Sequence, residues 1–277
     1  SILKEESELD MEAAHCYIKP QYTSDSKKIT DLRDTLNKYV SSKITYNFGN
    51  SSETLTGNTI NKWLSVNCSF EIVVDHNKVN DYIDMLSRKY NTAGKTRRFN
   101  TSGSGAINIG GGDYGWIINK NKESENIISA IKEGKAVTKE PEYSQTALCH
   151  SENDIGNTYV EIDLSQQHMW FYKNGSLIVQ GSVVTGNVSN GTGTPRGIFA
   201  LKYKLRNAVL KGPGYEAPVN YWMPFNGGIG IHDASWRGVF GGNIYISSGS
   251  HGCVNTSYPV AQAIFNNIDV NTPVVCY

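Results

Sequence analysis

The sequence changes character near Pro141, and this change most constrains the fold. Upstream of it, segments with apolar residues at helical spacing, such as 26–41, alternate with short strand-like runs. Downstream, runs rich in Val, Ile, Tyr and Phe are separated by Gly, Pro and Asn, and Asn174-Gly175 is a strong hairpin dipeptide. The pattern predicts an α+β chain, in which a mixed α/β half is followed by a mainly-β half.

Periodicity and capping residues place the elements of the first half. Asp75 stands where it would cap a helix over 75–91, and Gly134 stands where a left-handed residue ends helices. The segments that we expect to be ordered are helices at 26–41, 75–91 and 124–135, a shorter helix at 56–65, and strands at 44–48 and 70–75. In the second half only 257–267 has a helical pattern.

The same change in pattern predicts two domains. We place their boundary near Cys149 and His150, with 138–145 as the linker region. The predicted divisions are an N-terminal extension over 1–27, a mixed α/β domain over 28–149, and a mainly-β domain over 150–277.

Charge and hydropathy exclude two classes of partner. Lys plus Arg and Asp plus Glu both number 26, so no net field attracts the chain to nucleic acid or to an acidic membrane. No run approaches the roughly 18 apolar residues that a membrane span needs.

The chain starts at Ser1 with a charged segment, and we expect an export signal or anchor to precede it.

The five cysteines argue against a metal ribbon and against a dense disulfide framework. Their number is odd, and no two have Cys-x-x-Cys spacing. At least one thiol is therefore unpaired within the chain, and Cys253 is our candidate, because it lies in the turn-like segment SGSHGCVN.

A thiol is a strong nucleophile only as the thiolate, so it needs a nearby base. His232 ends a strand-like run 21 residues before Cys253, and a strand end is a rigid place to present a base. His251 is a second candidate, two residues from the thiol. Gly252 permits backbone geometry that lets successive N–H groups converge as an oxyanion hole, and Ser250 supplies an oxygen that could orient an imidazole.

Two other interpretations of these residues stay open. Cysteines are often small buried hydrophobes, and a lone histidine usually serves only as a hydrogen-bonding residue. His232, Asp233, His251 and Cys253 could also form a four-ligand metal set, although their spacing matches no zinc motif. We therefore expect no metal.

These residues, together with further segments of the chain, resemble the motifs of a known family. His232 followed by Ser250-His251-Gly252-Cys253-Val254-Asn255 resembles the signature of L,D-transpeptidases with a YkuD-type catalytic domain. TPRGIF at 194–199 resembles a second motif of that family, and the match covers roughly 157–277. Residues 44–49, 60–64 and 90–116 resemble the proposed peptidoglycan-binding domain that precedes such domains, an order similar to that in enterococcal members.

The resemblance implies a fold and a mechanism. The second half would be a β-sandwich with a helix. Cys253 would attack the carbonyl between the third residue and the terminal D-Ala of a stem tetrapeptide, and His232 would move the protons. Ser250, by its side chain or its backbone, would hold the tautomer of His232, and the N–H groups of Gly252 and Cys253, with His251, would bind the oxyanion. A neighbouring stem amine would then resolve the thioester into a 3→3 cross-link.

Four further residues are candidates for contacts with the substrate. Trp236, and Tyr221 with Trp222, flank the site in sequence and could wall a groove, although packing in the core explains them equally well. Asn255 is a candidate for substrate contact, but its place close to Cys253 favours a residue that supports the turn.

The resemblance also implies partners and a location. The partners would be peptidoglycan stem peptides, as acyl donor and acceptor, and carbapenem-type β-lactams, as covalent inhibitors. We expect a monomer at the outer face of the cell envelope, with roles in cell shape and β-lactam resistance. Two other functions stay open: an L,D-carboxypeptidase with the same Cys–His apparatus, and a non-catalytic wall-binding protein.

Overall fold

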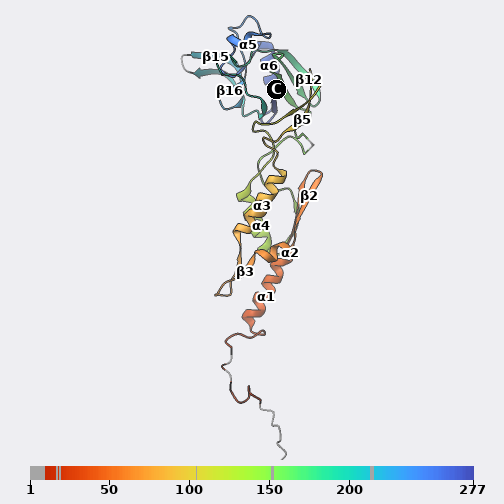
Figure 1. Cartoon of the computed structure of the whole chain (residues 1–277), viewed down its shortest axis with the longest axis vertical. Helices are drawn as coiled ribbons and strands as arrows, with labels where there is room; N and C mark the ends of the chain where they lie inside the picture. Colours follow the sequence, from red (N-terminus) through yellow and green to blue (C-terminus); the bar gives the residue numbers. More distant parts are fainter. Residues whose placement is uncertain (1–9, 17, 19, 104, 151–152, 213–214) are drawn as a thin grey trace, which may run out of the picture. The chain divides into compact units, whose positions relative to one another are not determined.

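The computed structural model describes residues 10–16, 18, 20–103, 105–150, 153–212 and 215–277 (Figure 1). Residues 1–9 of the predicted N-terminal extension lie outside the described residues. The described chain forms two compact units. One contains the residues up to Thr45, Thr54–Asn80 and Ser124–Lys139, and the other contains Tyr46–Glu53, Asp81–Glu123 and Glu140–Tyr277.

The first half of the chain alternates helices and short strands, as predicted. Asp75 caps α3 by accepting the N–H groups of Asn77 at 3.0 Å and Lys78 at 3.3 Å. The helices are α1 (Lys27–Val40), α2 (Gly57–Ile60), the 3-10 turn η1 (Asn61–Trp63), α3 (His76–Tyr90) and α4 (Lys120–Glu133). The strands are β1 (Lys43–Phe48), β2 (Ser51–Leu55), β3 (Leu64–Val66), β4 (Ile72–Val74), β5 (Arg97–Thr101), β6 (Gly105–Ile109), β7 (Ile117–Ile118), β8 (Ala136–Lys139) and β9 (Tyr143–Gln145).

Helix α4 ends as predicted but begins one turn earlier. Gly134 has φ +69°, and the N–H of Lys135 donates to the carbonyl of Ala130 at 3.1 Å, which closes the helix. The helix begins at Lys120 because Asn119 caps it, its Oδ1 accepting the N–H of Lys122 at 3.1 Å. The expected start at 124 was wrong, since the apolar pattern does not extend into this first, polar turn.

The second half of the chain forms two sheets. One has the strand order β12-β11-β10-β18-β13, and the other has the order β14-β15-β16-β17. The pairs β10–β18 and β16–β17 are parallel, and the other pairs are antiparallel. The strands are β10 (Tyr159–Asp163), β11 (His168–Lys173), β12 (Ser176–Ser182), β13 (Gly197–Ala200), β14 (Leu205–Gly212), β15 (Tyr215–Asn226), β16 (Ile229–Asp233), β17 (Val254–Thr256) and β18 (Pro273–Cys276).

Both sheets contribute to one hydrophobic core, together with helix α6 (Tyr258–Asn267). The core contains Phe171 and Val274 from the first sheet, Met223 and Ile231 from the second, and Ile264 from α6. In Figure 1, β12, β15, β16 and α6 gather around this core, beside the short helix α5 (Ile244–Ser248). The predicted β-sandwich with a helix is therefore confirmed.

A second core in the same unit includes residues from the first half of the chain. Phe99, Tyr114 and Trp116 pack with Ile198 and Val275. The buried guanidinium of Arg97 donates to both carboxylate oxygens of Asp154, at 2.5 and 3.0 Å. The segment that carries Arg97 to Trp116 thus shares a core with strands β13 and β18.

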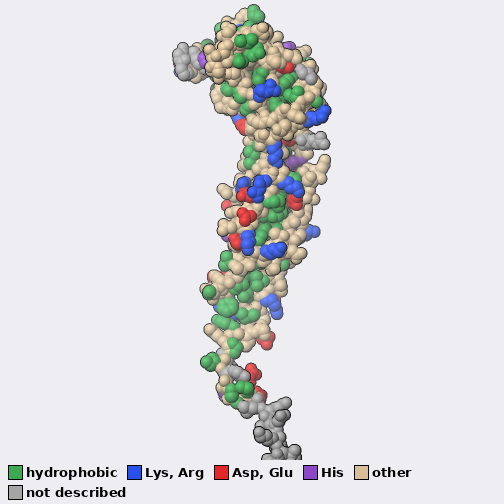
Figure 2. All heavy atoms as spheres, viewed as in Figure 1, with side chains coloured by type: hydrophobic (Ala, Val, Ile, Leu, Met, Phe, Trp, Pro, Cys, Tyr) green, Lys and Arg blue, Asp and Glu red, His purple; other side chains and the backbone are tan. Residues whose placement is uncertain are grey.

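The predicted hairpin at Asn174-Gly175 is confirmed. It connects β11 to β12, and both residues have positive φ, +52° and +81°, as a type I′ turn requires. Among the described residues, no helix is long and apolar enough to cross a membrane. Acidic and basic side chains are interspersed on the face shown in Figure 2, in keeping with their equal numbers.

Candidate active site

Strand pairing brings Cys253 and His232 into one cavity. Cys253 directly precedes β17, which runs parallel to β16, so that Asn255 lies opposite His232. Cys253 and His232 both line a cavity of about 260 Å³. Its other lining residues are Leu210, Ala217, Trp236, Arg237, Gly249, Ser250, His251 and Asn255. Residues that are far apart in sequence therefore meet around the thiol.

The loop that carries the thiol is held by a second loop. The Ser250 N–H donates to Thr185 O at 2.9 Å, and the Asn187 N–H donates to Ser250 O at 2.9 Å. The hydroxyl of Thr194 donates to Gly252 O at 2.7 Å. These contacts explain what the TPRGIF segment does locally, since its first residue, Thr194, supports the loop that presents Cys253.

Gly252 is needed for its backbone conformation. Its φ is +116°, and an added Cβ would lie 2.9 Å from Cδ1 of Ile229. Its N–H donates to Ser250 Oγ at 3.1 Å. This N–H is therefore engaged within the loop, and the expected oxyanion contact from Gly252 would need that bond to break.

Ser250 does not make the contact that the sequence suggested. Its hydroxyl donates to the carbonyl of Cys253 at 2.5 Å. The ring of His232 is instead held by the Asp233 carbonyl, which lies 2.8 Å from Nδ1. The expected Ser250–His232 contact was wrong, because Ser250 closes a turn within its own loop while the neighbouring residue of His232 supplies the acceptor.

The hydrogen bonds of His232 define its tautomer. A carbonyl can only accept, so the Asp233 carbonyl requires the proton on Nδ1. Asn255 Nδ2 lies 3.0 Å from Nε2, and Asn255 Oδ1 accepts the Nε–H of Arg237 at 2.9 Å. The amide nitrogen of Asn255 therefore faces Nε2, which accepts. His232 rests as a neutral imidazole with its lone pair on Nε2, the form that a general base needs.

Burial keeps both reacting groups uncharged. It lowers the pKa of His232 from its ordinary value of 6.5, against the opposing effect of the Asp233 carbonyl. Burial also raises the pKa of the Cys253 thiol above 9.0, against a backbone interaction with Gly230. The thiol lies 3.6 Å from the carbonyl of Gly228, to which it can donate. The resting pair is thus thiol and imidazole, not thiolate and imidazolium.

Asp233 is occupied by protein donors. Its carboxylate accepts the backbone N–H groups of Asn220 and Tyr221 at 2.9 and 2.8 Å, and the side-chain amide of Asn220 at 2.7 Å. Within the described ranges, no group of three or more His, Cys, Asp or Glu side chains is arranged to hold a metal ion. These hydrogen bonds therefore indicate that Asp233 is a structural residue.

The three aromatic residues expected as walls lie in different environments. The Trp236 side chain is 52% exposed, lines the cavity, and has its ring centroid 5.9 Å from that of His232. Tyr221 is buried in the main core against Phe265 and hydrogen-bonds Gln262. The substrate-wall interpretation of Tyr221 was wrong. Side chains alternate along β15, so Trp222 faces His232, with its ring centroid 5.8 Å from the imidazole, while Tyr221 faces inward.

The remaining predicted residues also have clear positions. His251 is exposed and lines the cavity. Asn255 is buried and contacts His232 and Arg237, so it supports the base rather than presenting itself to substrate. Sequence reasoning missed Arg237. A charged side chain directly after Trp236 was the only signal, and it does not reveal the contact with Asn255.

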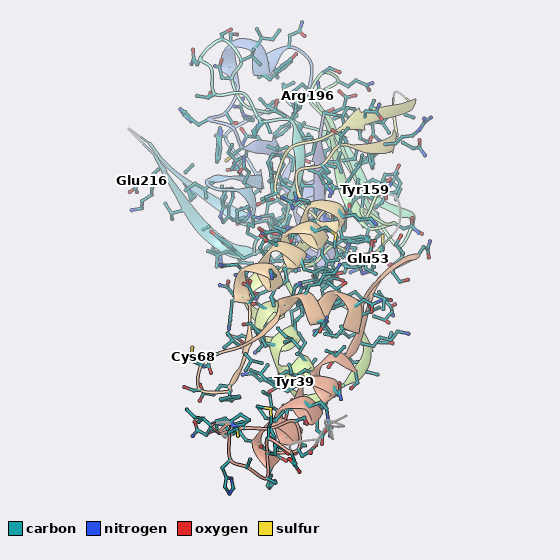
Figure 3. All side chains as sticks on the ribbon, turned by 60° about the horizontal axis from the view of Figure 1, so that its bottom comes forward. Tyr39, Glu53, Cys68, Tyr159, Arg196 and Glu216 are labelled. Atoms are coloured by element: carbon teal, nitrogen blue, oxygen red, sulfur yellow. The ribbon has the colours of Figure 1, made fainter. Side chains whose placement is uncertain are left out.

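The extended hairpin of β14 and β15 contributes the apolar part of the cavity. Leu210 from β14 and Ala217 from β15 line it. Figure 3 shows this hairpin projecting from the sheet, with Glu216 near its end, where it pairs with Lys211 at 2.8 Å. Cys253 packs against the buried cluster of Ala208, Val219 and Trp222.

Comparison with known proteins finds two family matches. Residues 157–276 match the YkuD family, described as the L,D-transpeptidase catalytic domain. Residues 22–139 match a family described as a proposed peptidoglycan-binding domain. A search of curated proteins returns no match.

Two solved structures are similar over most of the chain. One is a Cys-to-Ser mutant of the L,D-transpeptidase of Enterococcus faecium, 33% identical, with a TM-score of 0.71 over 89% of this chain and 100% of that one. The other is the avibactam carbamoyl form of the enzyme named Ldtfm, also 33% identical, with a TM-score of 0.71 over 90% of this chain and 98% of that one.

Proposed function

Because the chain belongs to the L,D-transpeptidase family with a YkuD-type catalytic domain, we propose that it forms 3→3 cross-links in peptidoglycan by cysteine-dependent acyl transfer. The observation that carries the proposal is the shared cavity, which is lined both by Cys253, on a glycine-containing loop, and by His232, a neutral imidazole with its proton on Nδ1. A nucleophile, its base and an adjacent apolar groove are the parts that acyl transfer requires.

The first half-reaction transfers the acyl group to the enzyme. The thiol proton moves to His232 Nε2 as Cys253 Sγ bonds to the carbonyl carbon that precedes the terminal D-Ala. The N–H of Cys253 would stabilise the oxyanion, and the N–H of Gly252 would join it once its bond to Ser250 Oγ breaks. The C–N bond then breaks, His232 returns the proton to the leaving amine, D-Ala departs, and a thioester remains on Cys253.

The second half-reaction regenerates the thiol. An amine on a neighbouring stem attacks the thioester, and His232 takes up its proton. The new C–N bond to the acyl carbon is complete when the C–S bond breaks, and the proton returns from His232 to Cys253. No cofactor is required, because one amide bond replaces another. With neutral resting groups, deprotonation of the thiol accompanies its attack.

A product assay tests this function directly. The purified chain is incubated with a disaccharide-tetrapeptide, and the products are identified by mass spectrometry. Transpeptidation gives a dimer that lacks one D-Ala, whereas carboxypeptidation gives only the tripeptide. A tripeptide without any dimer, at high acceptor concentration, would assign the alternative hydrolase function instead. Neither product would contradict both enzymatic functions and favour a wall-binding protein.

The avibactam carbamoyl form of the similar enzyme suggests how lactam-type inhibitors would act on this chain. We expect a carbapenem to acylate Cys253, because its strained amide presents the same kind of carbonyl as the stem peptide. Intact-protein mass spectrometry should show one added drug mass, and digestion should place it on the Cys253 peptide. Cys253→Ala should abolish both the adduct and the cross-linking while the fold is retained.

The other thiols are internal controls for this labelling. Cys16 and Cys68 are exposed, Cys149 is half-buried, and Cys276 is buried. A non-specific electrophile would label the exposed thiols first. An adduct on Cys16 or Cys68 with Cys253 unmodified would show that Cys253 is not the activated nucleophile.

The match of residues 22–139 supports a role at the cell wall. The proposed substrates, stem peptides as donor and acceptor, place the enzyme at the outer face of the cell envelope, where it would act as a monomer. Retention of the chain on insoluble peptidoglycan sacculi in a sedimentation assay tests the wall contact.

A further inference from the structure

A chain of hydrogen bonds connects Arg237 to the catalytic base. Arg237 Nε donates to Asn255 Oδ1 at 2.9 Å, and Asn255 Nδ2 lies 3.0 Å from His232 Nε2. At the far side of the ring, Nδ1 lies 2.8 Å from the Asp233 carbonyl. The imidazole is therefore held at both nitrogens, and one of its two supports depends on Arg237.

The chemistry of each group determines which atom donates and which accepts in these hydrogen bonds. A guanidinium has only donors, so the atom of Asn255 that faces Arg237 must be the oxygen. The amide nitrogen then faces His232, and a donor at that place requires Nε2 to be an acceptor. Rotating the amide by half a turn would place its NH₂ group against the guanidinium and leave two donors face to face.

Arg237 is itself held in position. Its Nη1 donates to Ser248 O at 3.0 Å, and its backbone N–H donates to Ala234 O at 3.0 Å, which forms a turn after β16. The side chain of Asn255 is buried, so water cannot readily replace a lost partner. A guanidinium held by the Ser248 carbonyl, on a backbone held by a turn, can thus determine which way a buried amide points.

We propose that Arg237 is a positioning residue, which fixes the Asn255 amide and thereby keeps His232 neutral, with its proton on Nδ1 and with Nε2 as the acceptor of the Asn255 N–H. This inference rests on the proposed function for its catalytic meaning. The hydrogen-bond arrangement itself does not depend on which acyl donor is used.

The arrangement has a consequence for proton transfer. When His232 takes the thiol proton at Nε2, the new N–H faces the N–H of Asn255, and the oxygen that could accept it is held by Arg237. The protonated base is therefore not stabilised by Asn255, and it readily returns its proton to the leaving amine. The other charged or titratable groups around the ring are Cys253 and His251 from the facing loop and Asp233 on its own strand.

The test is the protonation state of His232, measured by NMR on the ¹⁵N-histidine-labelled chain without substrate. In Arg237→Met the amide is free to rotate and offer its oxygen to a protonated ring. We expect the titration midpoint of His232 to rise by about one pH unit, and the acid limb of kcat/KM to move with it. Arg237→Lys, which keeps the charge but not the planar fork, should give a smaller rise.

A double-mutant cycle separates positioning from a direct charge effect. If Arg237 acts through Asn255, the shift caused by Arg237→Met should fall to less than half in an Asn255→Ala background. Arg98→Met is the matched control, because Arg98 is an exposed arginine on β5, and its loss should leave the midpoint unchanged.

Two outcomes would overturn the proposal. An equal shift in both backgrounds would mean that only the positive charge of Arg237 matters. An unchanged midpoint and tautomer in folded Arg237→Met and Arg237→Lys would mean that Arg237 supports the fold alone. Failure of the proposed function is seen separately, as absence of Cys253 acylation and of cross-linked product in the unsubstituted chain.

Discussion

At the scale of single residues, the surroundings of Cys253 and His232 keep both side chains uncharged in the resting enzyme. Burial raises the pKa of the thiol and lowers that of the imidazole, so both shifts oppose an ion pair. This differs from thiol enzymes that store a thiolate beside a positive partner. It suits a reaction in which the nucleophile is needed only when an acyl donor excludes water from the site.

The pH dependence of transfer follows from these directions. Below about pH 6.5 the unshifted imidazole would be protonated, but the lowered pKa of His232 keeps it a base to more acidic pH. We expect kcat/KM to fall only at a pH below 6.5. In alkylation by iodoacetamide, Cys253 should react slowly at neutral pH and faster above pH 9. Fast alkylation at pH 6, as from a preformed thiolate, would contradict the neutral pair.

Replacement of the two site histidines should have unequal effects. General base catalysis contributes about 10²–10⁴-fold, so His232→Ala should lose activity by that factor. His251→Ala should lose less, because the ring of His251 is exposed at the cavity. Initial rates of cross-linking by both variants, with folding checked by circular dichroism, measure the difference. A loss below roughly tenfold for His232→Ala would exclude it as the base.

At the scale of elements, the site is built from one loop and two adjacent strand ends. Parallel pairing of β16 and β17 places Asn255 opposite His232, and the turn before β17 presents Cys253. Thr194 and Thr185 anchor that turn from a neighbouring segment. The geometry of the nucleophile therefore depends on the backbone conformation of a few residues.

Gly252→Ala tests how tightly that conformation is required. A Cβ at Gly252 would meet Ile229 at 2.9 Å, and its φ of +116° strains any other residue by about 1–3 kcal/mol. We expect carbapenem acylation of Cys253 to slow by at least roughly tenfold, since the thiol is displaced. Gly193→Ala is the matched control, because a Cβ there meets nothing within 4 Å. Similar acylation rates in both variants would show that the turn is not constrained.

At the scale of the whole molecule, the sequence boundary near residue 150 does not separate the hydrophobic cores. Phe99, Tyr114 and Trp116 pack with Ile198 and Val275 within one unit. The ion pair between Arg97 and Asp154 is buried in the same region, with each side chain less than 5% exposed. We expect the stability of the sandwich to depend on residues upstream of its first strand.

Arg97→Met measures this dependence. The substitution leaves the Asp154 carboxylate buried without its partner, which should lower the free energy of unfolding by about 3–5 kcal/mol. Urea unfolding, followed by tryptophan fluorescence, gives the value. Arg98→Met removes the same charge from the exposed face of the same strand and should change stability by less than about 0.5 kcal/mol. Equal effects of the two substitutions would contradict the structural role of Arg97.

Local sequence signals determined most of the element order. Asp75, Gly134 and Asn174-Gly175 act through hydrogen bonds and dihedral angles within a few residues, so their effects were readable without the fold. The same holds for Cys253, because the glycine and serine that shape its turn are its sequence neighbours. The start of α4 was missed because a polar first turn carries no apolar pattern.

Contacts across the sheets could only be decided by the tertiary structure. Adjacent residues of a strand face opposite sides, so strand register alone places Trp222 beside His232 and Tyr221 in the core. Arg237 reaches Asn255 because a turn after β16 and the pairing of β16 with β17 bring them together. The sequence by itself determined which residues could carry the chemistry. The tertiary structure decided which partner holds each of them, because those partners come from segments that meet only after the strands have paired.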